Sequence, residues 1–71
     1  MARMMSISDL LHEARMRRRV SVTELAATVG VSPAAVYGWE AGRNRPTDSN
    51  LKAVCRVLKL PIRATLNVEK L

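Results

Sequence analysis

The stretch from Ser21 to Pro33 constrains the fold more than any other, because it encodes two helices with almost no chain between them. Ser21 followed three residues later by Glu24 is a capping box, in which each side chain accepts a hydrogen bond from the other residue's backbone amide. Gly30 suits the left-handed conformation that ends a helix, and Ser32 with Pro33 suits the start of the next one. The connection spans about three residues, and so short a turn forces a sharp angle between the two helices.

Apolar residues recur at the spacing of a helix face in two further segments of the chain. The first set is Ile7, Leu10, Leu11 and Ala14, and the second set is Leu51, Val54, Cys55 and Leu58. Aromatic residues make up only 3% of the chain, so the core must come mainly from aliphatic side chains, among which Ala and Leu are strong helix formers. We therefore predict an all-α fold, a small bundle of four to five helices over residues 8–18, 22–29, 32–41 and 48–58.

The hydrophobic period changes after Pro61. Ile62, Ala64, Leu66 and Val68 alternate with polar residues, and a period of two is typical of a half-buried strand. Because a lone strand is not stable, a strand over 62–68 would pair with a second copy of the chain. A short fifth helix over 61–66 is the alternative.

The length and charge of the chain limit its class. Its 71 residues form one small domain over 1–71, with a helical core at 8–60 and a C-terminal extension at 61–71 that we expect to serve dimerisation. Twelve Lys and Arg residues against six Asp and Glu residues give a net charge of +6. Most of the basic residues are arginines, which suit forked contacts to phosphate. Nucleic acid is the first partner to consider, and an anionic membrane surface is the second.

Other chemistry finds little support in the sequence. His12 stands alone on a polar helix face, where we expect it to be solvated, and Cys55 is expected to be an inert core thiol. With a single cysteine no internal disulfide can form, which favours a reducing cytoplasm. No His/Cys cluster could hold a metal, no glycine-rich phosphate loop is present, and no apolar run approaches the about 20 residues that span a bilayer. We expect no enzyme, no metal, no cofactor and no membrane partner.

Residues 22–41 carry a more specific pattern, which extends to Arg15, to the loop GRNRP and to segment 51–58. The residues that carry it are Leu25, Ala26, Gly30, Val31, Val36, Trp39 and Glu40. Over about 8–60 the chain resembles the helix-turn-helix DNA-binding domains of the phage-repressor and Cro type, also called Xre-like. The resemblance implies a small repressor-like bundle that binds double-stranded DNA as a homodimer, with helix 32–41 in the major groove. It also implies a structural salt bridge between Arg15 and Glu40.

The resemblance places base-reading side chains mainly at Pro33, Ala34 and Gly38. Bidentate reading of guanine or adenine needs Arg, Lys, Asn or Gln, and none of these stands there. What remains is apolar contact of Pro33 and Ala34 with thymine methyl groups, and a close backbone approach at Gly38. Ser32 and Tyr37 complete this surface, although Tyr37 can equally half-cover the core. We therefore expect modest specificity, through methyl contact and DNA shape.

Phosphate contacts are better provided than base contacts. Thr23 and the exposed amides at the start of helix 22–29 can hold one phosphate. Arg43, Asn44 and Arg45, with their backbone amides, can hold another beyond helix 32–41. Arg17 can reach the flanking backbone, with a solvated helix end as the alternative reading.

The sequence thus predicts a sequence-specific transcriptional regulator, most simply a repressor that occupies an operator. We expect it in the cytoplasm, at the nucleoid of a bacterial or phage-type system. Two alternatives stay open. One is an antitoxin or adaptor whose fold binds a protein such as a toxin, with DNA binding secondary. The apolar residues at the base-reading positions favour this alternative, and the net charge opposes it. The other is a basic DNA-binding protein with weak specificity.

Overall fold

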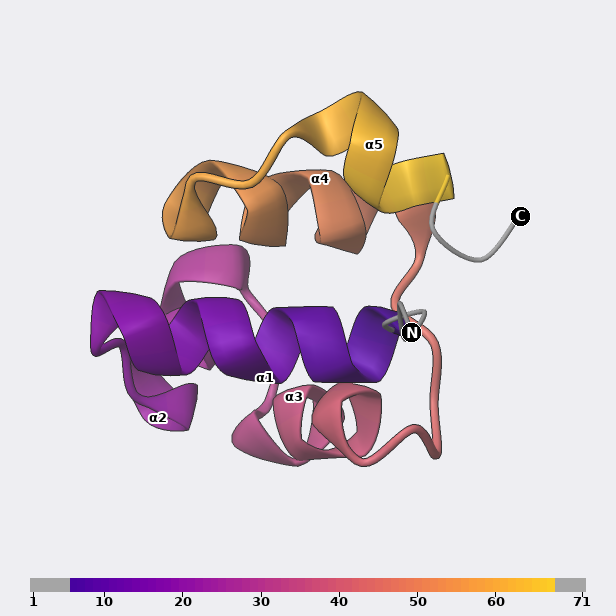
Figure 1. The fold of residues 1–71 in the computed structure, drawn as a ribbon. Helices are drawn as coiled ribbons and strands as arrows, with labels where there is room; N and C mark the ends of the chain where they lie inside the picture. Colours follow the sequence, from indigo (N-terminus) through magenta and orange to yellow (C-terminus); the bar gives the residue numbers. More distant parts are fainter. Residues whose placement is uncertain (1–5, 68–71) are drawn as a thin grey trace.

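The computed structural model describes residues 6–67, which form five helices (Figure 1). These are α1 (Ile7–Arg18), α2 (Val22–Val29), α3 (Pro33–Glu40), α4 (Asp48–Leu58) and α5 (Ile62–Asn67). The all-α prediction is confirmed, and the predicted limits of the first four helices lie within one residue of the observed ones. In Figure 1, α4 and α5 lie on one side of α1, and α3 lies on the other side.

Hydroxyl side chains set the starts of the first four helices. In each case the hydroxyl oxygen accepts a hydrogen bond from the backbone N–H three residues later, at 3.0 to 3.2 Å. The four capping residues are Ser6, Ser21, Ser32 and Thr47. The capping box at α2 is complete, since Glu24 Oε1 also accepts from the Ser21 amide at 3.2 Å. The helix starts are therefore local properties of the sequence.

Three helices end at a residue in the left-handed conformation. Gly30 does so at φ 88°, without steric cost, whereas Arg19 at φ 55° and Lys59 at φ 58° carry a Cβ. After each of these two residues, the next amide donates back to the carbonyl five residues earlier, at 3.1 Å behind Arg19 and 2.9 Å behind Lys59. This hydrogen bond closes the Schellman motif and satisfies a carbonyl at the helix end. It holds both side-chain-bearing residues in a conformation that costs about 1–2 kcal/mol.

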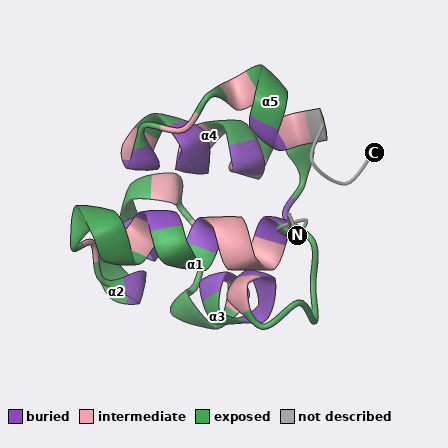
Figure 2. Cartoon of the chain, in the orientation of Figure 1, coloured by how far each residue is buried: buried purple, intermediate pink, exposed green. Residues whose placement is uncertain are grey.

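The core is formed by the inner faces of the first four helices, as the buried residues in Figure 2 show. Its members are Ile7, Leu11, Ala14, Val22, Leu25, Ala26, Val36, Trp39, Leu51, Val54, Cys55 and Leu58. Ala26 is 1% exposed in α2, which packs against both α3 and α4. A larger side chain there would push these helices apart. Cys55 is a buried free thiol.

The predicted strand over 62–68 is wrong, because residues 62–67 form helix α5. In the alternating pattern Thr65 should be exposed and Ala64 buried, but Thr65 is 1% exposed and Ala64 lies at the surface. Ile62 and Leu66 share the inward face with Thr65 at helical spacing and pack against the core. α5 thus covers α4 of its own chain. Within the described residues no strand is therefore present that could pair with a second copy of the chain. Val68 and the rest of 68–71 lie outside the described residues.

Candidate nucleic-acid interface

The turn between α2 and α3 consists of Gly30, Val31 and Ser32, the length that the sequence predicts. The left-handed Gly30 donates its amide to Ala26 O at 2.8 Å, and Val31 donates to the same oxygen at 2.9 Å. The first two amides of the turn are therefore satisfied by a carbonyl near the end of α2. Ser32 then starts α3, and its hydroxyl accepts from the Ala35 amide. These hydrogen bonds hold the short turn, which sets α3 across α2.

α3 is buried on one face and exposed on the other. Val36 is fully buried and Trp39 is 5% exposed, which pins the inner face to the core. The outer face presents Pro33 and Ala34 to solvent, and Tyr37 is 57% exposed. This outer face is apolar and carries no base-reading side chain of its own except the Tyr37 hydroxyl. Its support is rigid, as a surface that docks into a groove requires.

A partly buried ion pair joins the end of α3 to α1. Arg15 donates from Nε to Glu40 Oε2 at 2.7 Å and from Nη2 to Glu40 Oε1 at 2.9 Å, and its Nη1 donates to Val20 O at 3.0 Å. The two side chains are 11% and 9% exposed. Burial by itself would raise the pKa of Glu40, but the hydrogen bonds from Arg15 and His12 and the attraction of Arg15 together hold that pKa below its ordinary value. The hydrogen bond with Glu40 raises the pKa of Arg15. The pair therefore stays charged and orients α3.

His12 takes part in this cluster, which corrects its expected solitary place in solvent. Its Nδ1 lies 2.8 Å from Glu40 Oε1, and about half of its side chain remains exposed. The sequence contains no local signal for this contact, because the two residues are 28 positions apart.

Gly38 is buried, contrary to the expectation that its bare backbone faces DNA. The side chain of Asn44 covers it: a Cβ built at Gly38 would lie 2.6 Å from Asn44 Nδ2 and 3.4 Å from Asn44 Cγ. The backbone of the loop is tied to the same place, since the Arg43 and Asn44 amides donate to Gly38 O at 3.0 and 3.2 Å. These two amides are therefore already engaged, which corrects the prediction that they hold a phosphate.

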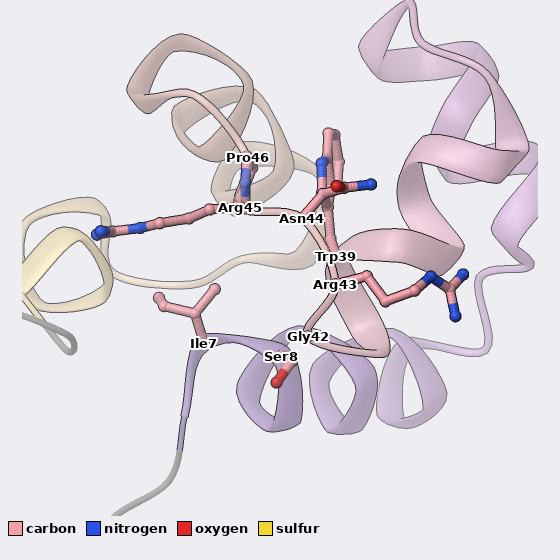
Figure 3. Close-up of a pocket in the computed structure, with 8 residues that line it drawn as sticks. All are labelled: Ile7, Ser8, Trp39, Gly42, Arg43, Asn44, Arg45 and Pro46. Carbon is pink, nitrogen blue, oxygen red and sulfur yellow. The ribbon is translucent and has the colours of Figure 1, made fainter.

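The basic loop after α3 borders a shallow pocket between α1 and α3 (Figure 3). The pocket is lined by Ile7, Ser8, Trp39 and residues 42–46. In Figure 3 the side chains of Arg43 and Arg45 leave the loop in opposite directions. The two guanidinium groups are thus not placed to clasp one phosphate together. Gly42 makes the tight bend possible at φ 76°.

Two further predicted phosphate contacts lie on other helices. Thr23 is exposed in the first turn of α2, beside the capping box, and Arg17 is exposed in the last turn of α1. Neither side chain forms a hydrogen bond or ion pair with α3 or its loop among the described residues, and both phosphate contacts stay predictions. Within residues 6–67, no three potential metal ligands come together and no helix is long and apolar enough to cross a bilayer.

A three-residue turn joins two short helices, α2 and α3. The second helix has an exposed outer face, and a basic loop follows it in the chain. This arrangement defines a helix-turn-helix DNA-binding domain. The family model for helix-turn-helix domains matches residues 11–64, and the chain belongs to this family, in its phage-repressor and Cro (Xre-like) type. A comparison with curated proteins found no match.

Proposed function

We propose that the chain is a transcriptional regulator that binds operator DNA as a homodimer, with the outer face of α3 in the major groove. The observation that carries the proposal is the exposed face of Pro33, Ala34 and Tyr37, presented by a helix whose opposite face is locked into the core. An eight-residue helix reaches few base pairs. Two copies on half-sites about one helical turn apart would multiply a modest preference into useful specificity.

Affinity in this proposal comes mainly from phosphate contacts. Arg43 is exposed in the loop that follows α3, and Thr23 lies at the N-terminal, positive end of the α2 dipole. Repression needs nothing more than occupation of a promoter by such a dimer. The residues we propose for DNA contact are Arg17, Thr23, Ser32, Pro33, Ala34, Tyr37, Arg43, Asn44 and Arg45.

Salt dependence tests the proposal. Each phosphate neutralised contributes about −0.9 to the slope of log K against log salt concentration. Fluorescence anisotropy with random-sequence duplexes should therefore show affinity falling steeply between roughly 50 and 200 mM salt. Arg43→Ala should lower the affinity for all sequences by a similar factor and reduce the slope by about 1 per copy.

Arg63→Ala is the matched control, since it removes the same charge from exposed α5, which lies on the other side of α1 from α3 (Figure 1). It should leave the slope nearly unchanged. A chain that binds no duplex even at low salt would refute the proposal.

A second candidate function follows from the same surface. The outer face of α3 is apolar, which suits a protein partner such as a toxin as well as thymine methyl groups. In that case the chain is an antitoxin or adaptor, and its binding would depend little on salt. Random-site selection separates a sequence-specific regulator from a weakly specific basic protein, because only the former enriches a motif.

A further inference from the structure

Asn44 belongs to the loop, but its side chain lies on α3. The three atoms nearest to a Cβ built at Gly38 are all from Asn44: Nδ2 at 2.6 Å, Cγ at 3.4 Å and Cβ at 3.7 Å. The carboxamide therefore fills the volume that a side chain of residue 38 would begin to fill. Gly38 is a glycine in a helix interior, where that residue is unfavourable, and a larger residue there would have to displace the Asn44 amide.

The position of Gly38 places this carboxamide on the outer side of α3. Gly38 follows Ala34 by one helical turn, and residues four apart lie on the same face. Ala34 is exposed, and Val36 and Trp39 mark the opposite, buried face. Asn44 is itself exposed to solvent. Its amide thus lies about one helical turn beyond Ala34, on the same outer face of α3.

The backbone holds Asn44 in this place. Gly42 takes a left-handed conformation, and the Arg43 and Asn44 amides both donate to Gly38 O. The loop is thereby bonded to the residue that the side chain covers. Because the loop backbone is already held in place, binding would not have to order it, and only the side-chain torsions of Asn44 would be fixed on contact.

The chemistry of the carboxamide supplies what the outer face of α3 lacks. Asn carries an acceptor oxygen and a donor NH₂ group side by side, which match N6 and N7 of adenine in the major groove. Pro33, Ala34 and Gly38 offer no such pair. We propose that Asn44, lying over Gly38, is the side chain that reads an adenine of each half-site. This inference rests on the proposed function, and it replaces a phosphate role for the Asn44 side chain.

Two substitutions test the assignment from opposite sides. Asn44→Ala removes the carboxamide. Gly38→Ala keeps it but places a methyl group where Nδ2 now lies, and because Nδ2 is the far end of a flexible side chain, the amide should move away at little cost to folding. Both variants should keep a cooperative thermal transition. Asn50→Ala, which removes a carboxamide from α4, is the matched control.

The measurement starts with random-site selection on the unchanged chain, followed by affinities for the selected duplex and for the same duplex with single base pairs replaced. The discrimination in favour of adenine at one position per half-site should be about 5- to 150-fold, the range of a good bidentate contact. Asn44→Ala and Gly38→Ala should each abolish it. In the Asn44→Ala background, Gly38→Ala should change the preference no further, and Asn50→Ala should leave it intact.

The other outcomes overturn the inference in distinguishable ways. If Asn44→Ala weakens binding to all duplexes by the same factor and lowers the salt slope, the side chain holds a phosphate, and the proposed function stands without this inference. If the preference for adenine persists in Asn44→Ala, or if no preference exists, Asn44 is no reader. If the unchanged chain binds no duplex, the proposed function fails first and the inference fails with it.

Discussion

Removal of the Glu40 carboxylate should break the contact between the end of α3 and α1 and lower the stability of the chain. Glu40 accepts two hydrogen bonds from Arg15 and lies within 2.8 Å of His12 Nδ1, with only 9% of its side chain exposed. In Glu40→Ala the Arg15 guanidinium stays largely buried and keeps only its bond to Val20 O. The variant therefore loses an ion pair and leaves a charge without its partner.

The size of the loss follows from this geometry. Breaking a buried pair by removing one partner costs about 3–5 kcal/mol. Arg15 is 11% exposed and keeps one acceptor, so we expect about 2–3 kcal/mol here. A domain of this length has a total stability of roughly 4–10 kcal/mol, so this loss is a large part of it. For a domain of this size, the same loss should lower the melting temperature by about 10–20 °C.

A double-mutant cycle in urea, followed by circular dichroism, measures the effect. Arg15→Met, Glu40→Leu and the combined variant complete the cycle, and the combined variant should be more stable than either single one, because no charge is left buried. Glu13→Ala, an exposed carboxylate on α1, is the control and should stay within about 0.5 kcal/mol of the unchanged chain. A loss below about 0.5 kcal/mol for Glu40→Ala, or a coupling of zero, would refute the reasoning.

Three further predictions concern stability. Because the pKa of Glu40 is lowered on folding, the contribution of Glu40 to stability is complete above the unfolded pKa near 4.5 and is lost as the pH falls through the lower folded value. The unfolding free energy measured against pH in the acid range should therefore decrease over this interval. Glu40→Gln should flatten that dependence. Lys59→Gly should stabilise the chain by about 0.5–1 kcal/mol in thermal unfolding by relieving the left-handed backbone, whereas Lys59→Ala should not; equal effects would assign the gain to charge. A chain that ends at Pro61 should melt at a lower temperature, because α5 with its buried Thr65 covers α4; an unchanged midpoint would show that α5 contributes nothing.

Dimerisation stands apart from these predictions. Residues 62–67 form a helix packed on their own chain rather than the predicted strand between two copies, so a shorter chain tests stability rather than association. The oligomeric state therefore has to be measured on the full chain, in the presence and absence of the selected duplex. Sedimentation at concentrations around those used for DNA binding would give it.

The sequence by itself determined the helices of the core and the turn between α2 and α3. The reason is physical: a cap such as Ser21 with Glu24, or a left-handed Gly30, acts within three or four residues, and the apolar period of a helix needs no knowledge of its neighbour. The failure at 62–68 has the same origin. A six-residue helix is too short for its period to be read, and packing on α4, rather than polarity, decided that Thr65 is buried.

Only the tertiary structure decided the chemistry of the candidate interface. His12 meets Glu40 across 28 positions, and Asn44 meets Gly38 because a left-handed Gly42 folds the loop back onto α3. Neither contact is indicated by an apolar period or by a capping motif in the sequence. Both depend on where two separately formed elements come to rest, which packing of the core determines. A glycine inside a short helix was the one visible sign that another side chain takes its space.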